Sequence, residues 1–148
     1  MRLDDTDKKI LNVVLDNPKL SVRDIAKHTN VSPVTVLKRV KALENEGIIK
    51  SYTTYLDYQK AGYDIDVMIN IRVSKGKLLE VEEKLASNKN VFAVYDITGD
   101  FDILAIAKFK NRKTLDQFVK KIQTYPHVER TDTILILNTI KERFIGID

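Results

Sequence analysis

Two kinds of hydrophobic spacing divide the chain. From Leu3 to Gly47, apolar residues recur at the three- and four-residue intervals of amphipathic helices. From Ile65 onward, short runs alternate between apolar and polar residues, as half-buried strands do, and helical spacing separates some of these runs. The stretch between the two parts is polar. The pattern predicts a helical domain at residues 1–54, a hinge at 55–64 and an α+β domain at 65–148.

The first helix of the N-terminal half has a clear start and stop. Asp4 and Asp7 stand where it would begin, and Asn17-Pro18 ends it. Two more helices are expected before Gly47, and Ile48–Thr53 is predicted to form an extended wing. This order is typical of a winged-helix unit. The buried stripe of the first helix is expected to be Ile10, Leu11, Val14 and Leu15.

The second and third helices are joined by a tight turn. Ser21 can cap the second helix, with Asp24 three residues later at the spacing of a capping box. Asn30 occupies the turn position that needs a left-handed backbone, which asparagine tolerates best among the non-glycine residues. Ser32 can cap the third helix, and Pro33 suits its first turn. These signals predict a helix-turn-helix.

Positive charge gathers on this helix-turn-helix. Between Lys19 and Lys41 there are six basic residues and one acidic residue, a local net charge of +5 in 23 residues, whereas the whole chain carries +4. Such a surface suits the phosphate backbone of duplex DNA. The alternative is a generic amphipathic helical pair with a solvated basic face. With Val36, Val40 and Leu43 turned inward, the residues expected to contact DNA are Ser21, Ser32, Pro33, Val34, Thr35, Lys38 and Arg39.

The second half predicts the order β-α-β-β-α-β of a ferredoxin-like domain. Strands are expected at residues 67–73, 91–98, 101–109 and 133–140, and helices at 77–87 and 111–124. Both helices of such a unit lie on one side of the sheet, and the other side would be polar if it faced water. Leu104, Ile106 and residues of the last strand make it apolar. A second copy of the sheet would cover it in a two-fold dimer, or else the linker or tail folds over it.

Composition limits the other functions. The chain has 148 residues, of which 43% are hydrophobic and 31% charged, a balance typical of one or two soluble globular domains. It has no apolar run long enough to span a membrane and no signal-peptide pattern. It has no cysteine and only His28 and His127, so disulfides and thiolate zinc sites are excluded. No acid–base grouping or phosphate-binding glycine loop is evident. We expect a cytoplasmic protein that is not an enzyme and holds no metal or cofactor.

Three blocks of sequence, in this order, resemble the Lrp/AsnC family, the feast/famine regulators of bacteria and archaea. They are LDDTDKKILNVVLDNPKLSVRDIAKHTNVSPVTVLKRVKALENEGIIKSYTTYLD near the N-terminus, GDFDILAIAKF at residues 99–109 and VERTDTILIL at residues 128–137. The resemblance covers essentially the whole chain. It implies an N-terminal DNA-binding domain and a C-terminal domain of RAM type that dimerises and senses small molecules, usually amino acids. It also implies dimers that assemble into octamers or other higher forms. Asn30 and Val31 depart from the more usual Gly-Leu in the turn.

The loop around Gly99 is the candidate effector site. Gly99 lets the backbone turn tightly and leaves N–H groups open to a carboxylate, and Asp100 or Asp102 could pair with an α-amino group. Taken alone, these residues fit a plain hairpin turn better. The resemblance favours the site, because the matching loop lines the effector pocket between dimers in the family. It also implies that Thr131 and Thr133 face this loop and hydrogen-bond the ligand.

Three functions therefore remain open. A sequence-specific transcription regulator modulated by an amino acid agrees with the local charge and with the resemblance. A small metabolic enzyme or enzyme-regulating subunit, built on the ferredoxin-like domain, is an alternative from another class. A nucleoid-organising DNA-binding protein without an effector is the third.

Overall fold

A computed structural model describes residues 2–148, which form two compact units. The helical unit consists of the residues up to Tyr55 together with Lys141–Asp148, and the sheet unit is Leu56–Ile140. The sequence predicted one domain over residues 65–148, whereas the structure places the last eight residues with the helical unit. No helix within residues 2–148 is long and apolar enough to cross a membrane.

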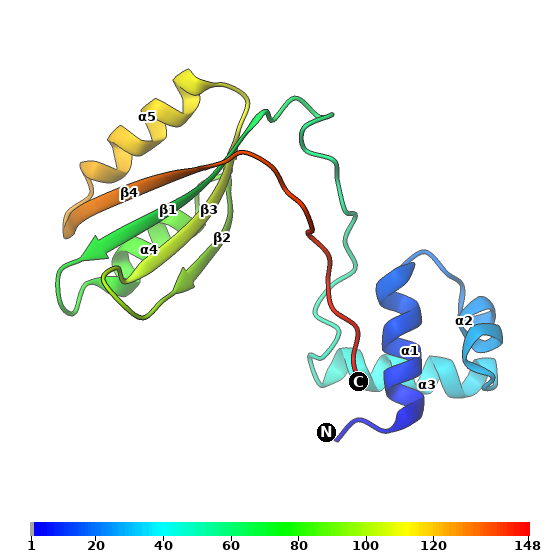
Figure 1. Ribbon diagram of the computed structural model, residues 1–148. Coiled ribbons are helices and arrows are strands. Elements are labelled where there is room, and N and C mark those ends of the chain that lie inside the picture. Colours follow the sequence, from blue (N-terminus) through cyan, green and yellow to red (C-terminus); the bar gives the residue numbers. More distant parts are fainter. Residues whose placement is uncertain (1) are drawn as a thin grey trace. The chain divides into compact units, whose positions relative to one another are not determined.

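Three helices make up most of the helical unit: α1 (Asp5–Asp16), α2 (Val22–Thr29) and α3 (Pro33–Asn45) (Figure 1). The predicted start of α1 is confirmed by a capping box, because the Asp7 N–H donates to the Asp4 carboxylate and the Asp4 N–H donates to the Asp7 carboxylate. Leu15, predicted to be buried, is exposed instead, at the end of α1. The three helices enclose a core of Ile10, Leu11, Ile25, Ala26, Val36 and Leu43.

The segment after α3 forms no wing strand. The N–H groups of Ile48 and Ile49 both donate to the Leu43 carbonyl, at 2.9 and 3.1 Å, and close the end of the helix. Residues 50–57 are neither helix nor strand. The predicted wing, Ile48–Thr53, is therefore irregular. It shares an apolar cavity with side chains of α1 and of the C-terminal residues, and these contacts supply no partner backbone for a strand.

The sheet unit has the predicted element order. Its four strands are antiparallel and lie in the order β2-β3-β1-β4. β4 pairs with β1 from Asp66 opposite Ile136 to Val73 opposite Val128, so it begins five residues before the predicted 133–140 and ends at Ile136. The elements are β1 (Ile65–Val73), α4 (Leu78–Ala86), β2 (Val91–Asp96), β3 (Ile103–Phe109), α5 (Arg112–Gln123) and β4 (Val128–Ile136).

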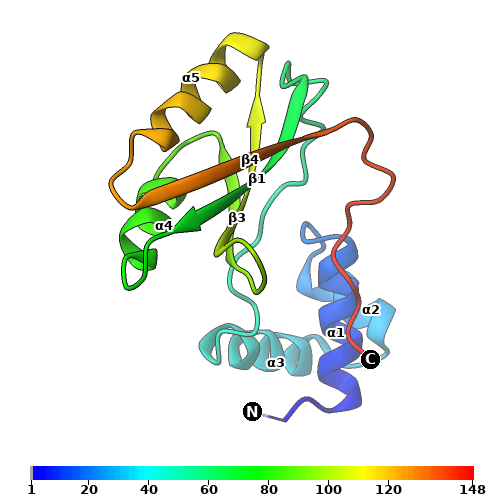
Figure 2. The same cartoon turned by 60° about the vertical axis from the view of Figure 1, so that its left-hand side comes forward.

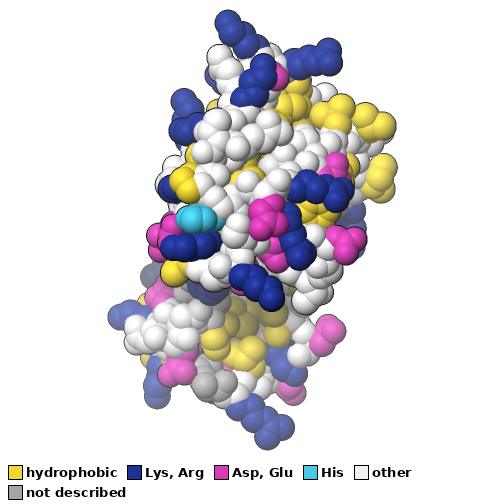
Figure 3. Space-filling model, turned by 90° about the vertical axis from the view of Figure 1, so that its left-hand side faces the viewer, with side chains coloured by type: hydrophobic (Ala, Val, Ile, Leu, Met, Phe, Trp, Pro, Cys, Tyr) yellow, Lys and Arg dark blue, Asp and Glu magenta, His cyan; other side chains and the backbone are white. Residues whose placement is uncertain are grey.

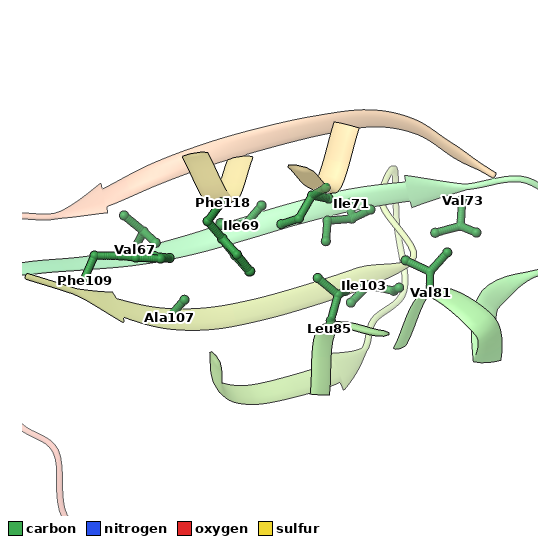
Figure 4. Close-up of a cluster of buried hydrophobic side chains, with 11 residues drawn as sticks. Val67, Ile69, Ile71, Val73, Val81, Leu85, Ile103, Ala107, Phe109 and Phe118 are labelled. Carbon is green, nitrogen blue, oxygen red and sulfur yellow. The ribbon is translucent and has the colours of Figure 1, made fainter. Parts of the chain in front are cut away.

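Both helices of the sheet unit cover the same face of the sheet (Figures 1 and 2). Alternate residues of β1 and β3 point toward α4 and α5, and Figure 4 shows these side chains meeting in one cluster. The rings of Phe109 and Phe118 have centroids 5.2 Å apart and join β3 to α5. The core residues are Val67, Ile69, Ile71, Val73, Val81, Leu85, Ile103, Ala107, Phe109, Phe118 and Ile122.

The other face of the sheet, called the open face below, is apolar across its middle, as predicted. In the strand register Met68 of β1 lies between Ile106 of β3 and Ile134 of β4. Tyr95 of β2 lies opposite Leu104 of β3 on the same face. Ile134 keeps 41% and Tyr95 50% of its surface exposed. Large apolar side chains therefore remain accessible on this face of the unit.

The linker closes one end of the open face. Lys108 of β3 lies opposite Asp66 of β1, and its ammonium is 2.7 Å from the Asp66 carboxylate. The ring of Tyr58, from the linker, has its centroid 5.3 Å from the Lys108 ammonium. The predicted alternative, cover by the linker, thus applies at this end, while the apolar middle stays open.

Candidate nucleic-acid interface and ligand loop

The turn between α2 and α3 has the predicted geometry. Asn30 adopts the left-handed conformation, with φ 56° and ψ 38°, and its N–H donates to the Ala26 carbonyl. The Ser32 hydroxyl caps α3 by accepting the Thr35 N–H at 3.1 Å, and Pro33 stands in the first turn. These local interactions fix the direction in which α3 leaves the turn.

The start of α2 is capped in a similar way. The Ser21 hydroxyl oxygen accepts the Asp24 N–H at 3.2 Å, and the hydroxyl donates to the Asp24 carboxylate at 2.6 Å. This hydrogen bond, helped by the nearby Lys27, holds the pKa of Asp24 below its usual value. The predicted pairing of Ser21 with Asp24 is present, and it orders the N-terminus of α2.

One side of α3 presents side chains to solvent. Its members recur at helical spacing and carry two positive charges next to two apolar side chains. Val34 is 77% exposed and Leu37 45% exposed, although both are apolar. We call this side the recognition face, which comprises Val34, Leu37, Lys38 and Lys41.

Part of the recognition face was predicted from the sequence. Val34 and Lys38 were predicted DNA contacts and are exposed, as are Ser21, Ser32 and Pro33, whereas Thr35 is half-buried beside Ser32. Leu37 was missed, because an apolar residue at helical spacing is indistinguishable in sequence from a core residue. Lys41 was counted in the local charge but not among the contacts. Its position seven residues after Val34 would have placed it on the same side.

Arg39 has a different environment. Its Nη1 lies 2.7 Å from the Asp4 carboxylate and 3.2 Å from the Asp7 carboxylate, both at the start of α1. Asp7 is only 1% exposed, and the charges of Asp7 and Asp4 raise the pKa of the Arg39 guanidinium. The sequence predicted that Arg39 contacts DNA, whereas the structure directs its guanidinium to α1, because the capping box presents two carboxylates there. Arg39 therefore ties α3 to α1.

On the face of the molecule that Figure 3 shows, charge does not by itself mark an interface. Lysine and arginine side chains alternate on this face with acidic ones and with apolar patches (Figure 3). The assignment of a nucleic-acid interface therefore depends on the geometry of α2 and α3 rather than on net charge.

The loop between β2 and β3 is fastened to the end of β1. The Asp102 carboxylate accepts the Val73 N–H at 2.8 Å and lies 3.7 Å from Nε of Arg72. Arg72 also donates to the Asp100 carbonyl at 2.8 Å. Gly99 has φ 116°, a conformation that favours glycine. Asp102 thus serves the loop's own structure, while the Asp100 carboxylate has no hydrogen-bond or ion-pair partner within residues 2–148.

The predicted ligand residues of β4 lie at the same end of the sheet as this loop. Ile71 of β1 accepts the Asp102 N–H and pairs with Thr131 of β4, so β1 separates the loop from Thr131. Thr131 accepts a hydrogen bond from Gln123 of α5 and, like Thr133, lies on the helix-covered side of the sheet. The structure therefore places Thr131 across β1 from the loop, at the same end of the sheet, and Thr133 two pairs farther along β4.

Arg130 contacts the loop directly and was missed. Its guanidinium lies 5.0 Å from the centroid of the Phe101 ring, at the tip of the loop. The contact depends on the register between β1 and β4, in which Arg130 lies opposite Arg72. The hydrophobic pattern places the start of this strand at residue 133, five residues after β4 begins, so it does not indicate Arg130.

Sequence profiles match both units. The profile for a winged helix-turn-helix DNA-binding domain matches residues 3–50, and the profile for the Lrp/AsnC ligand binding domain matches residues 66–145. The chain belongs to the Lrp/AsnC family. It is therefore a DNA-binding transcription regulator with a ligand-binding domain, in a family whose members are not enzymes.

Lrp/AsnC relatives match over nearly the whole chain. An HTH-type transcriptional regulator of Pyrococcus abyssi is 41% identical over 142 residues, which cover 96% of this chain and 97% of that protein. The structure of E. coli AsnC superposes with a TM-score of 0.90 at 27% identity, covering 98% of this chain and 99% of AsnC. The complex of the Neisseria meningitidis transcriptional regulator NMB0573 with L-Met gives a TM-score of 0.88 at 26% identity, covering 96% and 94%.

Proposed function

We propose that this Lrp/AsnC protein is a sequence-specific regulator that reads the major groove with the recognition face of α3. The observation that carries the proposal is the exposure of Val34, Leu37 and Lys38 on a helix whose start is fixed by Ser32 and the Asn30 turn. Apolar side chains of this kind suit the methyl group of thymine, and lysine suits guanine or phosphate oxygens.

The polar residues at the starts of α2 and α3 fit a supporting role. Ser21 and Ser32 are exposed next to backbone N–H groups at helix N-termini, which favour phosphate oxygens. Pro33 and Thr35 border the same end of α3. Arg39 holds α3 against α1 and acts on DNA binding through the position of the helix.

The test compares two lysines that differ only in location. Lys38→Ala removes a charge from the recognition face, and Lys113→Ala removes one from the exposed surface of α5 in the sheet unit. On a duplex selected from a random pool, we expect Lys38→Ala to raise the Kd about tenfold and Lys113→Ala to leave it unchanged. Equal effects of the two variants would contradict the assignment. Equal affinity for the selected and scrambled duplexes would favour a nucleoid-organising role.

We also propose that the loop Gly99–Asp102 binds an amino acid or a similar small molecule. Support comes from the match to a ligand-binding domain over residues 66–145 and from the relative NMB0573, whose structure contains L-Met. Within the loop, Asp102 is engaged by Val73, so Asp100 is the carboxylate left for an α-amino group. Thr131, whose hydroxyl accepts from Gln123, lies at the same end of β1, and Thr133 lies two pairs farther along β4.

Calorimetry with each of the twenty amino acids tests this site. Asp100→Ala should remove the binding heat of whichever amino acid binds, while Asp64→Ala, an exposed carboxylate elsewhere in the sheet unit, should retain it. Both variants should bind DNA like the wild type, because the recognition face lies in the other unit. Absence of heat from all twenty amino acids would contradict an amino-acid effector.

The open face is proposed to pair with a second copy of itself. Its apolar middle of Met68, Ile106 and Ile134 would be buried in a two-fold dimer, as self-complementary interfaces require. Dimers meeting at the Gly99 loop would then build a higher assembly, an octamer by resemblance to the family. A dimer also places two recognition helices on one duplex, with half-sites about one turn, or 34 Å, apart.

A further inference from the structure

The last eight residues pack with the helical unit, although β4, which precedes them, belongs to the sheet unit. Figures 1 and 2 show this segment, in red, beside α1. We call Lys141–Asp148 the strap. The Asn12 side chain of α1 accepts the Ile147 N–H at 2.8 Å and donates to the Ile147 carbonyl at 3.0 Å. The Asn12 amide thus pairs with the N–H and C=O of one strap residue, as a residue of a neighbouring strand would.

The strap is shaped to fit this contact. A Cβ atom added at Gly146 would lie 3.0 Å from Oδ1 of Asn12, tighter than nine in ten real contacts, so a side chain there would require Asn12 to shift by a few tenths of an ångström. Tyr55 adds a longer hydrogen bond to Glu142, at 3.4 Å. A random tail lying on a helix would need neither the paired amide nor the small residue opposite it.

An apolar cavity lies beneath the strap. Its volume is about 440 Å³, and its walls come from α1, from the irregular segment after α3 and from the strap itself. Phe144 and Ile145 line it yet remain 71% and 82% exposed, so the strap covers the cavity without filling it. An attachment of this kind, with a specific anchor and little buried area, can form and release reversibly.

The strap also makes a second covalent connection between the two units. The first passes through the linker near Leu56, and the second is Leu137–Ile140, between the end of β4 and the strap. Eleven Cα–Cα steps from Ile136 to Ile147, the residue bonded to Asn12, reach at most about 40 Å. While the strap is seated, β4 and α1 are therefore joined by a second tether of limited length, whereas its release leaves only the linker.

We infer that the groove beside α1 is the seat of the chain's own C-terminal segment, and that this strap restricts the movement of the DNA-binding unit relative to the sheet unit. The inference rests on the proposed function. It adds that the seated strap limits the spacing at which the two recognition helices of a dimer can contact DNA. The strap leaves the recognition face itself unchanged, because Asn12 lies on α1.

Disulfide trapping tests whether the strap of the same chain occupies the groove beside α1. The chain has no cysteine, so the double variant Asn12→Cys/Gly146→Cys contains one possible pair. The Cβ position at residue 146 is 3.7 Å from Cγ of Asn12, close to where the cysteine sulfur would lie. With oxidised glutathione as the oxidant, we expect an intrachain disulfide in a protein that migrates as a monomer in denaturing electrophoresis. The matched pair Lys9→Cys/Gly146→Cys should not close. An interchain disulfide, or none, would overturn the inference.

The dependence of DNA affinity on half-site spacing tests whether the strap restricts the movement of the DNA-binding unit. We expect Gly146→Val to loosen the strap, because its Cβ would lie 3.0 Å from Oδ1 of Asn12, whereas Arg143→Ala alters an exposed strap residue without touching the anchor. Adding about five base pairs between two half-sites, half a helical turn, should weaken wild-type and Arg143→Ala binding about tenfold but Gly146→Val binding only about threefold. Affinity for a single half-site should be equal in all three proteins.

The outcomes of these experiments distinguish a failure of the proposed DNA-binding function from a failure of the proposed role of the strap. If the wild type binds no duplex, the proposed function fails while the disulfide result still decides where the strap sits. If the wild type binds and Gly146→Val keeps the full spacing preference, the strap does not restrict the units. A wild type that accepts both spacings equally overturns the inference as well. Thermal unfolding of Gly146→Val, compared with the wild type, confirms that the helical unit remains folded.

Discussion

Lys38 and Arg39 are neighbours on α3, yet their side chains have opposite surroundings. Lys38 is exposed on the recognition face, whereas Arg39 faces two carboxylates of α1. Arg39→Ala would leave the buried Asp7 carboxylate without its countercharge, so we expect the melting temperature to fall by roughly 5 °C. Lys38→Ala should not change it. Circular dichroism during heating measures both variants.

For DNA affinity, we expect the opposite order of effects: Lys38→Ala should have the larger effect and Arg39→Ala the smaller. Assayed well below the melting temperature, Arg39→Ala should lose less affinity than Lys38→Ala, since its side chain does not reach the DNA in this arrangement. A variant Arg39→Ala that melts like the wild type and loses as much affinity as Lys38→Ala would show that Arg39 contacts DNA directly, as the sequence alone predicted.

Glu82 of α4 makes the sheet unit sensitive to pH. Its hydrogen bond with Asp96 of β2, together with partial burial and the Asp96 charge, raises the pKa of Glu82 from 4.5 to about 7. Between about pH 4.5 and 7, Glu82 therefore keeps a proton in the folded state that it releases in the unfolded state. The stability this proton provides is fully present below about pH 4.5 and is lost as the pH rises through about 7.

Glu82→Gln keeps a hydrogen-bond donor to Asp96 without titrating. We expect it to raise the melting temperature at pH 8 by about 4 °C, from a gain of about 1 kcal/mol after allowance for solvent exposure, and to have little effect at pH 5. The control is Glu83→Gln, an exposed neighbour on α4. Melting curves across this pH range measure the effect. Parallel curves for wild type and Glu82→Gln would contradict the shared proton.

The sequence predicted residue roles that depend on near neighbours and missed those that depend on distant ones. The caps at Asp4 and Ser32 and the left-handed Asn30 follow from residues within four positions, and all three are present. The Arg39–Asp7 pair joins residues 32 positions apart. Its formation depends on how α1 packs against α3, which hydrophobic spacing does not specify.

At the scale of elements, strand β4 shows the same limit. Its apolar second half was found, but Val128–Asp132 is rich in polar residues because this edge strand is exposed on much of its surface. Only pairing with β1 defines its beginning. The Arg130 contact with the ligand loop was hidden for that reason, whereas Gly99 and Asp100 were recognisable from local turn chemistry and from the resemblance.

Two adjacent residues of β4 test which face of the sheet mediates assembly. Ile134 lies on the open face and Leu135 on the helix-covered side, and both are partly exposed. Ile134→Asp would place a charge in the proposed dimer interface and should give a folded monomer at micromolar concentration. Leu135→Asp should remain dimeric. Light scattering after size-exclusion chromatography measures the mass, and a dimer of Ile134→Asp, or a monomeric wild type, would contradict the interface.

At the scale of the whole molecule, the proposed function combines the two units of the chain with the proposed pairing of two copies. The recognition face lies in one unit, and the ligand loop and open face lie in the other, so neither unit alone holds all three sites. The sequence predicted these two parts from the change in hydrophobic period. It did not predict that the strap returns to the helical unit, because the hydrophobic pattern of the last eight residues does not indicate which part of the chain they contact.

The salt dependence of DNA binding reports how many recognition helices engage one duplex. Lys41 lies seven residues after Val34 on the recognition face, toward the end of α3, where contacts shift from bases to phosphates. Each lost phosphate contact reduces the slope of log K against log salt by about 0.9. A dimer loses two contacts with one substitution, so Lys41→Ala should flatten the slope by about 1.8, whereas a monomer would lose about 0.9.

Fluorescence anisotropy between about 50 and 200 mM salt measures the slopes, with Lys113→Ala as the control. An unchanged slope in Lys41→Ala would remove Lys41 from the interface. A change of about 0.9 would mean that one recognition helix binds at a time, against the two-fold arrangement proposed for the open face.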